Sequence, residues 1–269
     1  MKVRIKTKEE IKRIREAGRI LAECHREIAK MIGPGITTLE IDAFVESFLA
    51  KRGAKAEQKG YHGFPFATCA SVNDVVCHGF PGDRKLALGD IVTIDIVVGK
   101  NGWMADSAWS YRIGQVSAEA EKLLTTTERA LMAGIAQAVP GNKIGDIGYA
   151  VQHVAQAANI GIVKPLIGHG IGQSMHEAPD VPNFGRPRTG VTLRPGMVIT
   201  IEPIFTGGET GAVLWEDDGW TIRNADGSLG AHYEHTLAIT AAGPLVLTDG
   251  EECGRRERKP SFSFVLTAH

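Results

Sequence analysis

Long apolar runs are absent from this sequence, and none approaches the roughly 18 residues that a membrane-spanning helix needs. The N-terminal stretch, residues 1–18, carries charges throughout and has no apolar centre, so it lacks the pattern of a signal peptide. We therefore expect a cytoplasmic protein that does not bind membranes.

An excess of either charge sign is also missing. The 30 lysines and arginines stand against 31 aspartates and glutamates, which leaves a net charge of −1. Such a chain does not attract nucleic acid by its overall charge, and no direct nucleic-acid site is evident. Cysteine is scarce, and no two cysteines form a CxxC pair: Cys24, Cys69, Cys77 and Cys253. This spacing argues against a disulfide framework or a cysteine-built zinc site and fits a reduced cytosolic protein.

What the sequence does contain is a clear pattern of helices. Its 269 residues, 43% of them hydrophobic, suffice for one large domain or two small ones. Thr7 and Glu10 form a predicted capping box at the first helix. Apolar residues at helical spacing, bounded by caps and glycine stops, predict four helices at residues 7–32, 38–53, 117–139 and 145–159.

Two stretches of the sequence recur at nearly one offset. Pro-Gly follows the first and the third predicted helix at positions 106 residues apart, and the strand pattern of residues 89–95 returns 107 residues later at 196–202. We interpret this as an internal duplication, although Pro-Gly after a helix is common enough to recur by chance. A duplication would put Asp95 and Glu202 at equivalent positions, facing a shared cleft.

A β-hairpin is predicted around Asn101-Gly102, the residue pair preferred in two-residue turns. With that turn, Asp106 lies opposite Val97, and Asp95 is a diagonal neighbour on the same face, roughly 7–8 Å away at the backbone. Asp95 interrupts an otherwise apolar strand, where a buried, unpaired carboxylate would cost several kcal/mol. A cation between the two acids would remove both the burial cost and their mutual repulsion.

Two further acids repeat this pattern. Glu202 lies in one apolar strand and Glu234 at the head of another, and these segments hold no lysine or arginine to pair with them. A salt bridge or an edge position would ordinarily explain one strand acid, but four of them favour a metal site. Carboxylates with an imidazole suit Mn, Fe(II), Co or Zn. About four negative charges would be balanced by two ions that share ligands.

Histidines in glycine-rich surroundings are the remaining polar signal. His169 and His176 lie in "GHGIGQSMHE" and are too far apart for a helical ligand pair, so they need not bind the same ion. His78 lies in a turn-flanked apolar run. For each of them metal ligation, catalysis and an ordinary hydrogen-bonded core position stay open, and the nearby carboxylates weaken the last of these.

Together these segments resemble type I methionine aminopeptidases over residues 5–248, in that family's order and spacing. The resemblance implies an α/β (α+β) pita-bread fold, with duplicated helix-helix-strand halves around a curved antiparallel sheet. We expect one catalytic domain, residues 1–249, with halves 1–114 and 115–249, and a C-terminal tail at 250–269. The likeness is carried by "NDVVCHG", "IDIVVGKNGWMADSA", "GHGIGQSMHEAP", "TIEPIF" and "HYEHTLAIT".

The resemblance also implies a pair of divalent ions, with Co, Mn, Fe(II) or Zn as candidates. Asp106 and Glu234 would bridge the two ions, and a water or hydroxide between the ions would be the nucleophile. Asp95 would complete the first ion's ligands. His169 and Glu202 would complete those of the second.

Catalytic and substrate-binding roles follow from the same resemblance. Glu202 would act as general base, His78 would lie near the substrate amine or leaving nitrogen, and His176 would donate to the scissile carbonyl. Met175 stands where relatives often have an aromatic residue, which leaves the pocket's shape open. The implied methionine pocket consists of Tyr61, Phe64, Cys69, Met175 and Trp220.

The implied activity is removal of the N-terminal methionine from nascent polypeptides whose second residue is small. We expect a monomer, with the ribosome as an open further partner. Glu202 and Glu234 are only 32 residues apart, too close for the helical insertion of type II enzymes. The alternatives are an X-Pro aminopeptidase or prolidase, which usually has a large additional N-terminal domain, and a non-catalytic binding protein, which typically loses metal ligands.

Overall fold

The four predicted helices are all present, and each begins within one residue of its expected start. The computed structural model describes residues 2–249, so the predicted tail at 250–269 lies outside the described residues. None of the described helices is both long and apolar enough to cross a bilayer. The helices are α1 (Lys8–Met31), α2 (Thr38–Ala50), α3 (Ala118–Gln137) and α4 (Ile144–Ala157).

The start of α1 is fixed as the sequence predicts. The hydroxyl of Thr7 accepts a hydrogen bond from the amide of Glu10 (3.2 Å), and the carboxylate of Glu10 accepts one from the amide of Thr7 (2.7 Å). Each side chain thereby satisfies an amide that the helix itself leaves without a partner. The predicted capping box is confirmed.

Antiparallel pairing joins the strands of every sheet in the described part of the chain. The first large sheet contains β1 (Lys55–Ala56), β4 (Ile91–Lys100), β2 (Cys69–Val72) and β5 (Trp103–Arg112). The second has the order β15 (Gly243–Val246), β14 (His235–Thr240), β9 (Val198–Ile201), β7 (Gly168–Gly170) and β8 (Glu177–Val181).

Two smaller sheets complete the strand layer, and a short 3₁₀ turn, Tyr61–Gly63, precedes β2. One has the order β13 (Gly230–His232), β10 (Ile204–Thr206) and β6 (Gly161–Ile162). The other has the order β11 (Val213–Trp215), β12 (Ile222–Asn224) and β3 (Val75–Cys77).

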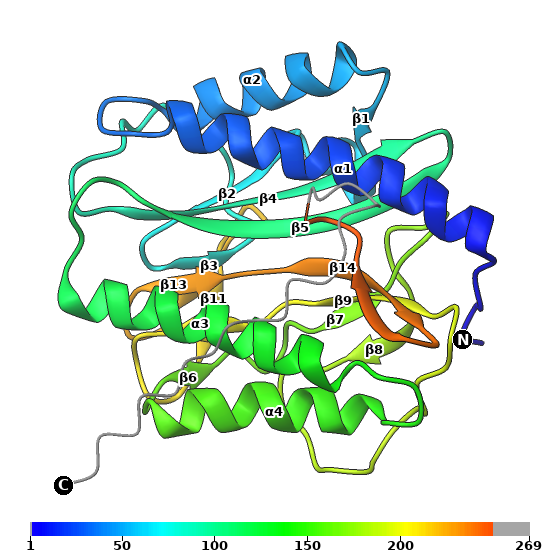
Figure 1. Ribbon diagram of the computed structural model, residues 1–269. Coiled ribbons are helices and arrows are strands. Elements are labelled where there is room, and N and C mark those ends of the chain that lie inside the picture. Colours follow the sequence, from blue (N-terminus) through cyan, green and yellow to red (C-terminus); the bar gives the residue numbers. More distant parts are fainter. Residues whose placement is uncertain (1, 250–269) are drawn as a thin grey trace, which may run out of the picture.

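The helices flank the strand layer in two pairs. Figure 1 shows α1 and α2 above the strands and α3 and α4 below them. One apolar core joins α1 and α2 to β4 and β5, and a second joins α3 and α4 to β9, β13 and β14. The polar centre of the molecule therefore lies among strands, between two separately packed halves.

The two halves repeat the same local geometry. Gly35 and Gly141 both have a φ of 92°, which is the left-handed region that favours glycine. The amide of Gly35 donates to the carbonyl of Leu86 (2.8 Å), and that of Gly141 donates to the carbonyl of Leu193 (3.0 Å). These matched turns support the duplication inferred from the sequence, while the boundaries between halves and tail stay predictions.

Side-chain hydroxyls join the halves where a regular ladder is missing. The hydroxyl of Thr236 accepts from the amide of Asp106 (2.9 Å) and donates to its carbonyl (2.8 Å). In the same way, the hydroxyl of Ser110 accepts from the amide of His232 (3.1 Å) and donates to its carbonyl (2.9 Å). These bonds, which we call the hydroxyl seam, hold β5 against β13 and β14 and fix the residues that precede and follow Glu234.

A close approach at Gly18 in α1 gives a test of this packing. A Cβ added at Gly18 would lie 2.2 Å from the carbonyl oxygen of Leu247, closer than side chains tolerate. Gly18→Ala should lower the unfolding free energy by about 2 kcal/mol, because overpacking outweighs alanine's gain in helix propensity. Thermal unfolding should then show a Tm lower by about 4–8 °C.

Gly33→Ala is the matched control, because nothing lies within 4 Å of the Cβ that it would add. Its Tm should stay near that of the original protein. An unchanged Tm for Gly18→Ala would mean that the end of the described chain does not pack on α1 as the structure has it.

Candidate metal centre and substrate site

The β4–β5 hairpin brings two acids together as the sequence predicts. Its turn lies at Asn101 and Gly102, both at positive φ (51° and 77°). Asp106 of β5 pairs with Val97 of β4 in the ladder. Asp95 lies two residues before Val97 on β4, so the two acids lie on the same face of the hairpin. The register and the shared face are therefore confirmed, and both carboxylates point to the polar centre.

Glu202 and Glu234 join this pair from the second large sheet. Glu202 directly follows β9, and Glu234 directly precedes β14. Their exposed fractions are only 9% and 2%, and Asp106 is 6% exposed. The hydroxyl of Thr200 donates to Oε1 of Glu202 (2.8 Å). Because the hydroxyl seam fixes the backbone on either side of Glu234, these acids converge on one small volume.

His169 faces the same volume from β7. Its Nδ1 lies 2.9 Å from the carbonyl oxygen of Gly170, and since a carbonyl only accepts, Nδ1 carries the proton. The unprotonated Nε2 then points at the acids, 3.8 Å from Asp106 Oδ2 and 3.7 Å from Glu202 Oε1. A histidine held in this way presents a free lone pair, as metal-binding histidines do. Burial lowers its pKa to about 3, which keeps the ring neutral.

The electrostatics of the four acids favour a bound cation. Burial raises the pKa of Asp95 to about 7 and that of Glu202 to about 8. The pKa values of Asp106 and Glu234 are raised well above the usual range. Burial is the largest cause, and repulsion by the neighbouring acids adds to it. Among the described residues, no lysine or arginine forms an ion pair with any of the four.

Unsatisfied oxygen atoms point to the same ligand. Asp95 Oδ1, Asp106 Oδ1 and Glu234 Oε1 are buried and have no hydrogen-bond partner in the described chain. One ligand atom each of Asp106, His169 and Glu234 lies within 4.8 Å of the others. Orphaned carboxylate oxygens beside a free imidazole nitrogen fit divalent metal ions, which supply the missing positive charge.

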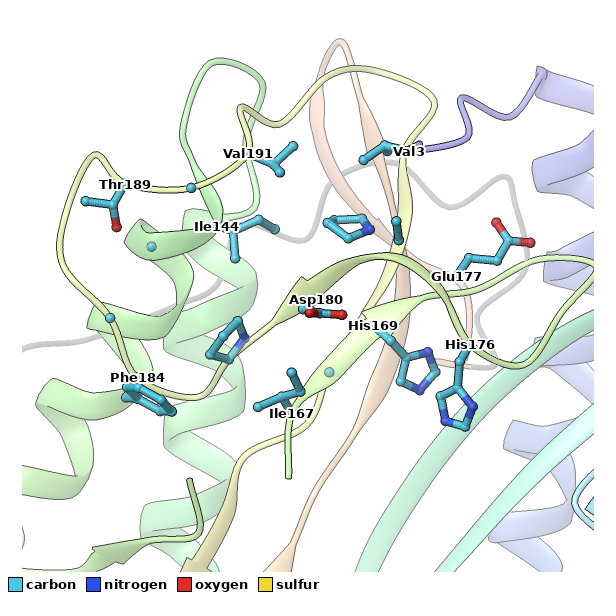
Figure 2. A pocket seen from close by; sticks show the side chains of 17 residues that line it. Val3, Ile144, Ile167, His169, His176, Glu177, Asp180, Phe184, Thr189 and Val191 are labelled. Carbon is cyan, nitrogen blue, oxygen red and sulfur yellow. The ribbon is translucent and has the colours of Figure 1, made fainter. Parts of the chain in front are cut away.

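Two further histidines lie beside this centre. The ring of His176 is 4.4 Å from that of His169, centroid to centroid, and its Nδ1 is 3.0 Å from the hydroxyl of Tyr61. Figure 2 shows the two imidazoles pointing the same way, at one end of a cavity of about 660 Å³. The ring of His78 lies 6.0 Å from that of Trp220. Burial lowers the pKa of His78 to about 4. It also lowers the pKa of His176.

Aromatic rings form an apolar group next to His78. Phe64 is 2% exposed and lies edge-on to Trp220, 5.1 Å between ring centroids. Phe80 lies 5.3 Å from Phe64 and from Phe66, and sequence reasoning missed both Phe66 and Phe80. The string "FPF" at 64–66 was the available signal for Phe66.

The other predicted pocket residues lie near the acids and His176. Cys69 is buried and pairs with Asp95 in the ladder between β2 and β4. Met175 is 7% exposed and directly precedes His176. Tyr61 contributes a polar contact, because its hydroxyl meets the His176 ring.

Supporting residues around the site were also missed. Lys6 is buried and pairs with Glu177 at 2.7 Å, which ties the N-terminal segment to the residue after His176. The side-chain amide of Gln58 donates a hydrogen bond to the backbone carbonyl of Asp95 (2.9 Å). His232 is 2% exposed and lies two residues before Glu234, on the same face of an extended segment. That spacing was the one signal from which His232 could have been found.

Comparison with known proteins agrees with this geometry. Residues 12–241 match metallopeptidase family M24. Methionine aminopeptidase 1 of Bacillus subtilis (strain 168) is 44% identical over 243 residues, 90% of this chain and 98% of that protein. The crystal structure of methionine aminopeptidase from Rickettsia prowazekii has a TM-score of 0.90 at 38% identity, covering 92% of this chain and 100% of that one.

The prolidase from Pyrococcus furiosus shares the fold alone. Its TM-score is 0.72 at 24% identity, and the match covers 92% of this chain but 66% of the prolidase. The predicted pita-bread fold and the resemblance to methionine aminopeptidases are confirmed. A site for divalent metal agrees with this assignment, and the chain belongs to metallopeptidase family M24.

Proposed function

We propose that this chain is a methionine aminopeptidase, which removes the N-terminal methionine from polypeptides with a small second residue. The observation that carries the proposal is the group of buried acids and His169, set beside two more histidines and an aromatic pocket. Relatives that share 39–46% identity over most of this chain carry this name. A prolidase function is the alternative. The solved prolidase shares only its fold with this chain, at 24% identity.

The proposed metal ligands form two overlapping sets. Asp95, Asp106 and Glu234 would hold one divalent ion, and Asp106, Glu234, His169 and Glu202 a second. Two ions balance the charge of about four buried carboxylates. The ions would supply positive charge to polarise the scissile carbonyl and lower the pKa of a bound water.

Glu202 has the environment of a general base. One of its carboxylate oxygens, Oε1, already accepts a hydrogen bond from Thr200 at 2.8 Å. The other oxygen is therefore the one that can take a proton from the attacking water and return it to the leaving amine.

His176 would donate to the scissile carbonyl, and Tyr61 sets the tautomer that this requires. If the Tyr61 hydroxyl donates to Nδ1 across their 3.0 Å contact, the proton of the neutral ring lies on Nε2. That N–H can then stabilise the negative charge that develops on the carbonyl oxygen. His78, neutral through burial, would accept from the substrate amine or the leaving nitrogen.

The aromatic group fits a methionine side chain. Phe64 and Trp220 present an apolar corner, and His78 lies against Trp220 at the same place. A thioether makes favourable contacts with aromatic ring edges. The methionine would therefore lie against these rings with its amine and carbonyl directed to the histidines and the metal centre.

Peptide hydrolysis tests the proposed activity. Metal-free enzyme should be inactive, and addition of Mn, Fe(II), Co or Zn in turn should restore cleavage of Met-Ala-Ser with at least one metal. Ala-Pro peptides are the matched control and should remain intact. Faster cleavage of Ala-Pro than of Met-Ala-Ser would favour the prolidase alternative, and equal activity without metal would contradict the proposed chemistry.

The two neighbouring histidines should respond differently to substitution. His169→Ala should lose metal affinity and activity together, because it removes a proposed ligand. His176→Ala should keep its metal content and Tm but lose kcat by roughly 10²–10³-fold, with KM changing much less. If His176→Ala instead lost metal as His169→Ala does, the division of roles would be wrong.

The raised carboxyl pKa values predict how the stability of the metal-free protein depends on pH. Between about pH 7 and 8 the folded protein retains protons on Glu202, and in part on Asp95, that the unfolded chain has lost. Stability should therefore fall as pH rises through this window, where histidines are mostly neutral in both states.

Thermal unfolding with a chelator, at pH 7 and pH 8, measures this effect. The Tm should be lower at pH 8, and added Mn(II) should raise Tm more at pH 8 than at pH 7. Glu202→Gln is the control, since it removes the group with a pKa of about 8 and should reduce the difference. A Tm that rises from pH 7 to pH 8 without metal would contradict the expectation.

A further inference from the structure

Two consecutive large apolar side chains are exposed on the strand β11. They belong to Leu214 and Trp215, whose exposed fractions are 59% and 55%. The other three tryptophans of the chain are buried or half-buried. Tryptophan is enriched among the residues that contribute most to binding at protein interfaces, because its large ring buries much apolar area on contact. The exposed indole therefore favours a contact with a partner at this surface.

The strand β11 lies next to the proposed methionine pocket. It forms a hairpin with β12, and the turn of this hairpin carries the pocket residue Trp220. Trp215 lies at the turn end of β11, where the amide of Glu216 donates to the carbonyl of Thr221 (2.9 Å). A polypeptide that leaves the pocket past Trp220 meets Trp215 first and then the rest of β11.

Trp215 also lies on the face of its sheet that leads to the metal centre. It pairs with Ile222 of β12, and Ile222 pairs with Cys77 of β3. Residues that pair directly across antiparallel strands point to the same face. The sulfur of Cys77 lies within 4.8 Å of a carboxylate oxygen of Asp95. This row of side chains therefore runs from the buried acids to the surface and ends at the exposed indole.

The outer edge of β11 is open. In the described part of the chain, β11 pairs with β12 alone. The hairpin's hydrogen bonds involve Ala212 and Glu216, and bonded residues alternate along an antiparallel ladder. Leu214 is thus bonded within the hairpin, whereas the amides and carbonyls of Val213 and Trp215 point outward. Extended peptides bind proteins by pairing with such an edge.

The segment around this edge is acidic. Residues 207–219 contain no lysine or arginine but four acids: Glu209, Glu216, Asp217 and Asp218. Arg223 balances one of them, since its guanidinium lies 2.6 Å from the carboxylate of Glu216. Asp217 is exposed. A partner whose charge complements this surface carries lysine or arginine side chains.

We propose that β11 binds the substrate polypeptide downstream of its methionine, as an added antiparallel strand that carries basic side chains. This inference rests on the proposed aminopeptidase function and adds to it a preference for basic, extended N-terminal segments. A strand added to β11 would lie three strand spacings, about 14 Å, from the backbone of Cys77. At about 3.3 Å per residue, the peptide reaches this edge roughly four residues beyond the scissile bond. A tripeptide is therefore too short to use this surface.

Binding of two labelled peptides to the metal-free, full-length protein tests the proposal without any cleavage. Both begin Met-Ala-Ser-Gly, and one continues Lys-Val-Lys-Val-Lys whereas the other continues Glu-Val-Glu-Val-Glu. Fluorescence anisotropy should give a Kd at least about tenfold lower for the lysine peptide, and added salt should reduce the difference. Trp215→Ala should weaken binding of the lysine peptide by about tenfold.

Two further variants separate the edge of β11 from general damage. Leu214→Ala is the matched control, because Leu214 is as exposed as Trp215 but lies on the other face and has its backbone bonded within the hairpin. It should bind the lysine peptide as the original protein does. Val213→Pro removes an outward-pointing amide, which edge strands tolerate, and should weaken binding. Tm values should establish that each variant folds.

Cleavage rates distinguish this inference from the proposed activity. With an activating metal, the lysine peptide should have a KM about tenfold below that of Met-Ala-Ser and a similar kcat, because contacts made equally before and during the reaction change KM alone. Trp215→Ala should remove this advantage and cleave Met-Ala-Ser as the original protein does.

The outcomes for binding do not depend on those for cleavage. Equal Kd values for the lysine and glutamate peptides, or unchanged binding in a folded Trp215→Ala, would overturn the proposal even if Met-Ala-Ser is cleaved. A lower Kd for the lysine peptide that Trp215→Ala abolishes would support it even if no peptide is cleaved.

Discussion

The cost of keeping four carboxylates in the interior, without a basic side chain among them, is the constraint on which this structure depends. Each acid is held by something other than a counter-charge: a hairpin register for Asp95 and Asp106, a threonine hydroxyl for Glu202, and the hydroxyl seam for Glu234. The fold thereby positions carboxylates whose charge is neutralised by a bound cation or, without one, by protons that burial retains. Stability and activity are consequently linked through the same ions.

The duplicated architecture explains how so polar a centre fits between apolar cores. Each half contributes its own helix pair and core, so neither core has to accommodate the acids. Asp95 lies within β4 and Glu202 directly follows β9, at matched positions of the two halves, as the offset of 107 residues indicates. The hydroxyl seam then joins the halves with polar contacts, which tolerate a charged neighbourhood better than apolar packing would.

Local rules made much of this predictable from sequence, and long-range contacts account for what was missed. The Asn101-Gly102 turn sets the hairpin register, so the shared face of Asp95 and Asp106 followed from spacing alone. His232 approaches Cys77 because of the way two separate sheets meet. The alternation of side chains along a strand predicts only which face of the strand a residue occupies. The buried pair of Lys6 and Glu177 spans 171 positions, and no local pattern indicates it. Phe80 likewise reaches Phe64 through tertiary packing.

The distribution of the metal-centre residues along the chain also determines when the centre can exist. His169 lies in the second half, and Glu234 comes near the end of the described chain. During synthesis, the first half alone would present Asp95 and Asp106 with no partner from β7, β9 or β14. The hydroxyl seam cannot form until Thr236 has emerged, because its contacts with Asp106 cross 130 positions. The proposed metal centre can therefore assemble only after residue 236 has been made, long after both aspartates have emerged.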